Sequence, residues 1–146
     1  MISNTLIDQI LSINSNQSHN HTVGDIENLF REYGFYTIRE YPIYKMQDGS
    51  RRAGRIDLVV RKSKFRIAIE YDHYKLIKWK SFQKVVQIRP ECAIVITGNG
   101  DLEPNVSRAL WYISKLKSPL YVVSLKEGKY EIIEPGQKGI SIYKGK

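Results

Sequence analysis

Two strand-like segments, residues 54–62 and 65–72, constrain the fold most, because only Ser63–Lys64 separates them. Both segments alternate apolar residues with polar or charged ones, as strands with two unlike faces do. So short a connection predicts an antiparallel hairpin. A turn at this point places Asp57 directly opposite Glu70, and opposed residues have Cβ atoms about 4.5–5.5 Å apart. The sequence therefore predicts a close pair of carboxylates on one face of a sheet.

A third carboxylate joins this face, because Asp72 lies two residues beyond Glu70 and side chains alternate along a strand. Like charges opposed across a strand pair are destabilising. Either one carboxyl group is protonated, or a divalent cation neutralises the group. Alternatively, the acids face solvent and pair with Arg61 and Arg66, which share their face. We expect the other face of the hairpin to pack in the hydrophobic core, because it carries Ile56, Leu58, Val60, Ile67, Ile69 and Tyr71.

The remaining segments predict helices and strands around this hairpin. Apolar residues at helical spacing indicate helices at 3–13, 23–33, 77–89 and 105–116, with a polar loop at 14–21 and Thr22 as the second helix cap. Further strands are expected at 36–46, 92–97, 120–125 and 129–134. This order predicts an α/β fold with a mixed central sheet flanked by helices. We expect a single domain, 1–146, made of an N-terminal helix and loop (1–21), a core (22–135) and a basic tail (136–146).

Charge and composition narrow the class of protein further. The chain has 146 residues and a formal net charge of +8, which favours a polyanionic partner such as nucleic acid. A single cysteine, Cys92, excludes an intrachain disulfide, and its apolar neighbours predict a buried thiol. The sequence has no signal-peptide pattern and no apolar run that could span a membrane, so we expect an intracellular, cytoplasmic protein.

The order of the acidic residues resembles the PD-(D/E)XK nuclease superfamily, which includes Holliday junction resolvases and restriction endonucleases. That family has an acid on a first helix, an aspartate in a strand, and Glu-x-Lys ending the next strand. The resemblance covers residues 22–116. It rests on Glu27 in Asp25-Ile26-Glu27-Asn28-Leu29-Phe30, on Asp57 in Gly54-Arg55-Ile56-Asp57, and on Glu70 ahead of a helix.

This resemblance implies a restriction endonuclease-like core and a Mg²⁺-dependent (or Mn²⁺-dependent) nuclease. In the family, the aspartate, the glutamate and the following carbonyl hold the metal, which here implies Asp57, Glu70 and the carbonyl of Tyr71. The metal polarises the scissile phosphate and activates a water that hydrolyses the DNA phosphodiester. The helix acid is matched best by Glu27. The other candidates are Asp25 and Glu32 on the same helix and Glu40 on the first strand.

The sequence departs from the family pattern at the lysine, where it has Asp72. Some members of the family carry the lysine on the next helix instead. Lys84 is the preferred replacement, with Lys75, Lys78 and Lys80 as alternatives. Such a lysine would orient or deprotonate the attacking water and stabilise developing negative charge. The departure leaves a second hypothesis open, a catalytically inactive nucleic-acid-binding module on the same fold.

Basic and aromatic residues surround the proposed site along the sequence. The expected phosphate contacts are Arg51, Arg52 and Arg55 ahead of Asp57, and Lys75, Lys78 and Lys80 after Glu70. They would make binding to DNA, double-stranded or branched, sensitive to salt. Tyr41, Tyr44, Tyr74 and Trp79 either stack on unpaired bases or belong to the core. His19 and His21 are expected to be exposed in a loop, and His73 is a weaker candidate for proton transfer. A homodimer is expected by analogy with the family.

Overall fold

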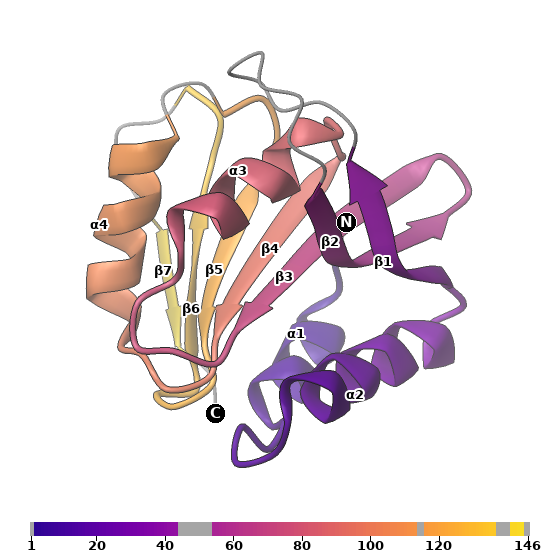
Figure 1. Cartoon of the computed structure of the whole chain (residues 1–146), viewed down its shortest axis with the longest axis horizontal. Helices are drawn as coiled ribbons and strands as arrows, with labels where there is room; N and C mark the ends of the chain where they lie inside the picture. The colour runs from indigo at the N-terminus through magenta and orange to yellow at the C-terminus, as the bar shows by residue number, and fades with distance from the viewer. Residues whose placement is uncertain (1, 44–53, 114–115, 137–140, 145–146) are drawn as a thin grey trace.

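The chain forms an α/β fold in which a mixed sheet lies between two pairs of helices (Figure 1). The computed structural model describes residues 2–43, 54–113, 116–136 and 141–144. The strands are β1 (Tyr36–Ile43), β2 (Gly54–Lys62), β3 (Phe65–Asp72), β4 (Cys92–Thr97), β5 (Leu120–Ser124), β6 (Lys129–Ile133) and β7 (Ser141–Lys144). They form a seven-stranded sheet in chain order. β3, β4 and β5 run parallel, and the other neighbouring strands run antiparallel. The expected mixed sheet flanked by helices is therefore confirmed.

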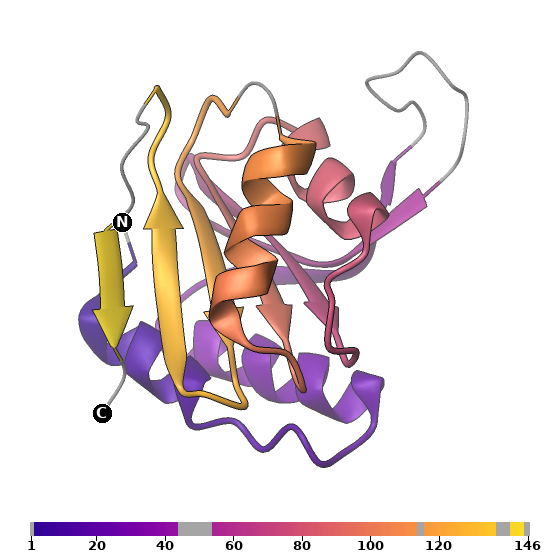
Figure 2. The same ribbon diagram turned by 90° about the vertical axis from the view of Figure 1, so that its left-hand side faces the viewer.

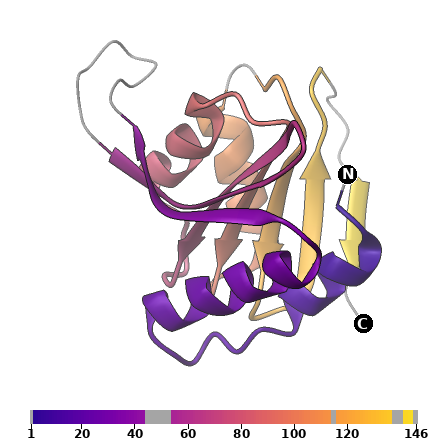
Figure 3. The same cartoon turned by 90° about the vertical axis from the view of Figure 1, so that its right-hand side faces the viewer.

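The four helices found in the described ranges divide between the two faces of the sheet. On one face, α1 (Asn4–Leu11) packs against α2 (His19–Glu32), and α2 contacts the first three strands (Figure 3). α3 (Trp79–Gln87) and α4 (Leu102–Tyr112) cover the other face (Figure 2). Each joins two neighbouring parallel strands, and such crossovers are almost always right-handed. Both helices therefore lie on the same side. No helix in the described ranges is long and apolar enough to cross a membrane.

Two hydrophobic cores hold these layers together. Phe30 and Tyr71 are among the largest buried side chains between α1, α2 and the sheet. On the opposite face, Phe82 and Val95 belong to the core beneath α3 and α4. The Cys92 thiol is buried, as expected, and burial raises its pKa to about 12. Because both faces of β3 and β4 are covered, the central strands are buried almost throughout.

The central hairpin is confirmed, with one correction at its open end. β2 and β3 have the predicted bounds, and their register runs from Lys62 opposite Phe65 to Leu58 opposite Ile69. The backbone pairing between β2 and β3 stops at Leu58 and Ile69. The next two residues, Asp57 and Glu70, are therefore not paired. Ile56 packs in the core beneath α3 while Leu58 packs beneath α2, so the expectation that the two share a face is wrong. A change of face between residues two apart shows that β2 is irregular at the residue between them.

Several other boundaries differ from the sequence prediction; α4, for example, ends at Tyr112 rather than at residue 116. α2 begins at His19 rather than after Thr22, because the Ser18 hydroxyl accepts a hydrogen bond from the backbone N–H of His21. α4 begins at Leu102, three residues early, because Pro104 lies in its first turn, where no N–H is needed. β7 lies in the tail, where no strand was expected. The predicted contacts Arg51 and Arg52, and also Tyr44, lie outside the described residues.

Candidate functional site

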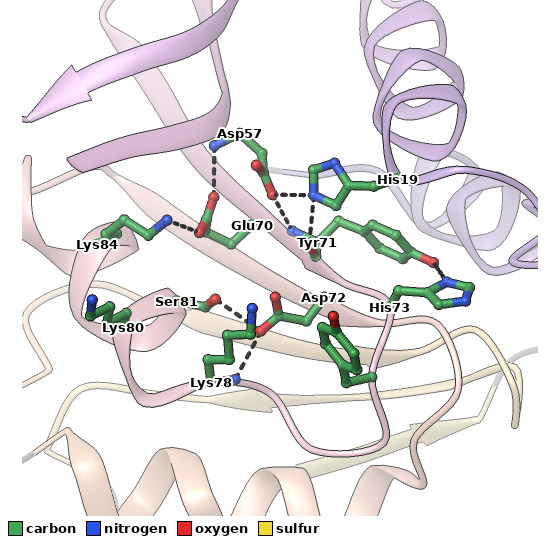
Figure 4. Close-up of a pocket in the computed structure, with 11 residues that line it drawn as sticks. His19, Asp57, Glu70, Tyr71, Asp72, His73, Lys78, Lys80, Ser81 and Lys84 are labelled. Atoms are coloured by element: carbon green, nitrogen blue, oxygen red, sulfur yellow. Dashed lines mark hydrogen bonds and ion pairs between the residues drawn. The ribbon is translucent and has the colours of Figure 1, made fainter.

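The irregular end of the β2–β3 hairpin brings the two predicted acids together. Instead of facing each other, the carboxylates bind the backbone of the neighbouring strand (Figure 4). The Glu70 carboxylate accepts a 2.6 Å hydrogen bond from the Asp57 N–H. In return, the Asp57 carboxylate accepts a 2.9 Å bond from the Tyr71 N–H. These bonds satisfy backbone N–H groups beyond the last paired residues of β2 and β3, and the two carboxyl groups remain close neighbours.

His19, which the sequence placed in a loop, reaches this point from the first turn of α2. Its Nε2 lies 3.3 Å from Asp57 Oδ2 and 3.1 Å from the carbonyl oxygen of Tyr71. These are two of the three groups that the family resemblance assigns to a metal. Sequence reasoning missed His19 because the Ser18 cap and the docking of α2 on the sheet bring it here. The only sequence signal was a serine three residues ahead of His21, which suits a helix cap.

Lys84 approaches the same point from α3, on the opposite face of the sheet. Its Nζ lies 2.7 Å from Glu70 Oε1 and donates a 3.0 Å hydrogen bond to the carbonyl of Arg55. The Glu70 side chain is almost fully buried, with 3% exposed, so its ion pair is shielded from water. The alternative of solvent-facing acids paired with Arg61 and Arg66 is therefore wrong. Figure 4 shows the Lys84 ammonium pointing at Glu70.

Asp72 points to neither Asp57 nor Lys84 but anchors the start of α3. Its Oδ2 accepts hydrogen bonds from the Lys78 N–H at 2.8 Å and from the Ser81 hydroxyl at 2.9 Å. Lys78 is the N-cap residue of α3, and its own side chain makes no capping bond. Asp72, buried at the end of β3, supplies that acceptor in its place. It thereby fixes the helix that carries Lys84.

A hollow of about 450 Å³ opens over these residues. His19, Asp57 and Glu70 lie along it, and α3 contributes Ser81 and Lys84. Its remaining lining residues are Tyr71, Asp72, His73, Tyr74, Lys78 and Lys80. Two expected phosphate contacts, Lys78 and Lys80, therefore border the acids. A concave site in which a few polar groups converge is the usual form of a ligand site.

The surroundings shift the pKa values of the two site carboxyl groups differently. Burial raises the pKa of Glu70 to about 8, the Asp57 carboxylate adds to the shift, and Lys84 opposes it. Burial also raises the pKa of Asp57, but the hydrogen bonds from His19 and the Tyr71 N–H outweigh it and lower the pKa overall. The bond to Asp57 raises the pKa of His19 to about 9. The pKa values of these two neighbouring carboxyl groups are therefore shifted in opposite directions, as often happens when two acids share a partly buried site.

The donor set fits a small divalent cation. A carboxylate oxygen of Asp57 and the carbonyl of Tyr71 converge on one imidazole nitrogen of His19, and Glu70 lies next to them. Carboxylate and carbonyl oxygens suit Mg²⁺ or Mn²⁺, and imidazole suits the transition metals. Within the described ranges, no three acidic, histidine or cysteine side chains are already grouped as metal ligands. Glu70 would have to turn from the Asp57 N–H to join such a group.

Glu27 is not brought to the site, which corrects the position expected for the helix acid. Its carboxylate bonds to Arg31 at 3.1 Å and to the Thr37 hydroxyl at 2.7 Å, and Arg39 lies 3.7 Å away. Glu27 lies eight residues along α2 from His19, a rise of about 12 Å at 1.5 Å per residue. The end of α2 that reaches the acids carries a histidine instead.

The remaining predicted contacts lie around the hollow or beside it. Arg55 is exposed and lies 3.7 Å from the carboxylate of Glu40, the alternative acid on β1. Lys75 lies in the loop between β3 and α3, next to the hollow but not in its lining. His73 lines the hollow and lies 3.2 Å from the Tyr71 hydroxyl, through its Nδ1. The Arg55 and Lys75 side chains therefore remain candidates for contacts at the rim.

Comparisons with known proteins show no family for this chain. The chain matches no family model, and no curated protein is significantly similar to it. Its structure resembles the crystal structure of AF1548, a protein of unknown function, with a TM-score of 0.48 and 16% sequence identity. The match covers 82% of this chain and 58% of that one, so this chain spans less than two thirds of AF1548. Any functional assignment therefore depends on the residues of the site.

Proposed function

We propose that this protein is a Mg²⁺-dependent (or Mn²⁺-dependent) nuclease that hydrolyses DNA phosphodiester bonds. One observation carries the proposal. Asp57, Glu70 and the Tyr71 carbonyl meet where β2 leaves β3, and Lys84 lies 2.7 Å from Glu70 although the usual lysine position holds Asp72. The same four groups follow from the resemblance to PD-(D/E)XK nucleases, which was drawn from sequence order alone. The fit of the side chains to that pattern supports the assignment.

Each residue of the site has a distinct role in this proposal. Asp57, Glu70, the Tyr71 carbonyl and His19 would hold the cation. When bound, the cation supplies the charge that polarises the scissile phosphate and activates the attacking water.

Lys84 acts beside this centre. Its ammonium, held by Glu70 and the Arg55 carbonyl, stays within reach of a phosphate in the hollow and stabilises the negative charge that develops there. Asp72 is a positioning residue, because it fixes α3 and touches no reacting atom.

The proposal is tested by incubating the purified protein with labelled single-stranded, duplex and branched DNA in Mg²⁺ or Mn²⁺. The wild type is expected to cleave at least one of them, and EDTA is expected to abolish cleavage. Asp57→Asn and Glu70→Gln are each expected to lower the rate by at least about 100-fold, because losing a metal ligand costs several kcal/mol of transition-state stabilisation.

A matched acid variant serves as the control. Glu32 lies exposed at the far end of α2 from His19, so Glu32→Gln is expected to cleave like the wild type. Circular dichroism checks that each variant is folded. Equal cleavage by the wild type, Asp57→Asn and Glu70→Gln would remove the metal site from the mechanism.

A second candidate function is a catalytically inactive nucleic-acid-binding module. Two observations favour it. Glu70, a proposed metal ligand, is already engaged in an ion pair with Lys84. Among the described residues, no three metal-binding side chains are grouped in advance. This alternative predicts salt-sensitive DNA binding that EDTA does not change and no cleavage of any substrate. The same incubation therefore separates the two functions.

A further inference from the structure

A second hollow, of about 500 Å³, adjoins the first one. Its lining residues are His73, Tyr74, Lys75, Asn99 and Lys126. His73 and Tyr74 also line the first hollow, so the two meet at the start of the loop that joins β3 to α3. The proposed function uses only the first hollow. A ligand that extends past the carboxylates along this loop would enter the second one.

The loop between the hollows, residues 73–78, is held in place by side chains from the neighbouring segment of the chain. Asn99 donates a 2.7 Å hydrogen bond to the His73 carbonyl, and the Thr97 hydroxyl donates one of the same length to the carbonyl of Tyr74. Asn105, buried on α4, donates to the Lys75 carbonyl at 2.9 Å and accepts from the Ile77 N–H at 2.7 Å. These hydrogen bonds fix the backbone of the loop and therefore the points from which its side chains project.

A glycine lets the neighbouring segment approach this closely. A Cβ on Gly100 would collide with the Lys75 carbonyl and with the side chains of Asn105 and Thr97. The backbone of the loop therefore rests directly on the β4–α4 connection. The loop is fixed by direct packing as well as by hydrogen bonds.

Tyr74 is exposed even though the backbone that carries it is fixed. Its side chain is 62% exposed, and its phenol ring lines both hollows, next to the exposed imidazole of His73. The Lys78 ammonium lies 4.9 Å from the centre of its ring, and Lys75 and Lys126 are exposed nearby in the second hollow. An exposed ring on a rigid loop among lysines matches the platforms on which single-stranded nucleic acids stack their bases.

We propose that Tyr74 stacks on an unpaired base next to the scissile phosphate, so that the substrate is single-stranded DNA or the unpaired strand of a branch. The two hollows then take successive nucleotides, with the phosphate at the carboxylates and the neighbouring base over Tyr74. Lys75 and Lys126 contact the backbone of the nucleotides in the second hollow. This inference rests on the proposed function only for the place of the phosphate. A base inside a duplex is already stacked and does not offer its face to a side chain.

The test measures binding in EDTA, so that it does not depend on cleavage. Fluorescence anisotropy compares a labelled single-stranded oligonucleotide with a hairpin duplex of the same composition. Tyr74→Ala is expected to weaken single-strand binding by about 5- to 100-fold, the range expected for one base–aromatic stack, and Tyr74→Phe is expected to preserve it. A 2-aminopurine placed at successive positions of the single strand should be quenched at one position by the wild type and by Tyr74→Phe, but not by Tyr74→Ala.

Tyr36 provides the matched control. It is a 65% exposed tyrosine with the Arg61 guanidinium 5.9 Å from its ring centre, but it begins β1 at the opposite end of the hairpin and lines neither hollow. Tyr36→Ala is expected to bind like the wild type. Unchanged single-strand binding by Tyr74→Ala, or an equal loss for duplex and single strand, would overturn the inference. If the wild type binds single strands through Tyr74 but cleaves nothing in Mg²⁺, the nuclease proposal fails and the stacking site stands.

Discussion

At the scale of single residues, a lysine and a histidine reach the two acids of the site from opposite faces of the sheet. Lys84 reaches Glu70 from α3, and His19 reaches Asp57 and the Tyr71 carbonyl from α2. The proposed mechanism gives them different roles, since Lys84 acts on the phosphate and His19 on the cation. Kinetics can separate these roles. Loss of a charge-stabilising residue lowers the cleavage rate at saturating Mg²⁺, whereas loss of a metal ligand raises the Mg²⁺ concentration needed for half-maximal cleavage.

Lys84→Met is expected to lower the cleavage rate at saturating Mg²⁺ by about 100- to 1,000-fold, the usual cost of losing one group that stabilises developing charge. The Mg²⁺ concentration for half-maximal cleavage should not rise, since removing a positive charge does not repel the cation. His19→Ala should give the opposite pattern and raise that concentration at least about 10-fold. Initial rates measured across a Mg²⁺ titration distinguish the two. Lys64→Met, at the exposed hairpin turn, is the control, and a wild-type rate for Lys84→Met would exclude the lysine.

The sequence predicted some of these residues and missed others for physical reasons. Asp57 and Glu70 follow from a two-residue connection, because a short hairpin fixes the register. Lys84 was the preferred one of four candidate lysines, because it lies on the side of the predicted helix opposite Trp79, Phe82 and Val86. His19 lies thirty-eight residues before Asp57, and only the packing of α2 on the sheet joins them. Local periodicity carries no information on such a contact.

At the scale of elements, the start of α3 decides where Lys84 lies. The helix begins at Trp79, and Asp72 accepts hydrogen bonds from the Lys78 N–H and the Ser81 hydroxyl. An aspartate at the position where the family carries its lysine therefore has a structural role here. In the proposed mechanism, Asp72 anchors the helix that supplies Lys84.

Asp72→Ala is expected to lower the free energy of unfolding by about 1–3 kcal/mol, because two donors lose their acceptor at a buried position. Asp72→Asn should lose less, since an amide oxygen still accepts. Urea unfolding followed by circular dichroism measures both. Asp101→Ala is the matched control: Asp101 caps α4 without a side-chain capping bond, and its exposed ion pair with Lys126 contributes at most about 1 kcal/mol. Equal losses for Asp72→Ala and Asp101→Ala would contradict the anchoring role.

Element boundaries were predicted well where side-chain patterns are local and less well at helix starts. β2, β3 and β4 have their expected bounds, because alternating or continuous apolar runs end sharply at turn residues. The starts of α2 and α4 were displaced by three or four residues, since a polar cap does not contribute to apolar periodicity. That displacement matters for function, because the missed first turn of α2 contains His19.

At the scale of the whole molecule, the candidate site draws on all three layers. α2 contributes His19 from one face, the hairpin contributes the acids, and α3 contributes Lys84 from the other (Figure 4). The layer order follows from the sequence of helices and strands. The convergence of the side chains does not follow from it, because it depends on β2 being unpaired with β3 before Leu58, where side chains from both faces meet at one opening. A regular hairpin would keep the contributions of α2 and α3 on opposite sides of the sheet.

The net charge of +8 is a property of the whole chain, but only lysines near the bound strand should affect how binding depends on salt. Each phosphate that a lysine neutralises contributes a slope of about −0.7 to log K against log salt for a single strand. Lys80, exposed on the first turn of α3 and lining the hollow, should contribute one such contact. Lys80→Ala is therefore expected to flatten the slope by about 0.7.

The measurement is anisotropy of a labelled single strand in EDTA over a series of NaCl concentrations. Lys64→Ala removes the same charge at the exposed turn between β2 and β3, far from the hollow, so its slope should match the wild type. Because both variants lower the net charge equally, a difference between them measures position alone. If Lys64→Ala flattened the slope as much as Lys80→Ala, the overall charge would govern binding. The hollow would then not be the DNA-binding surface.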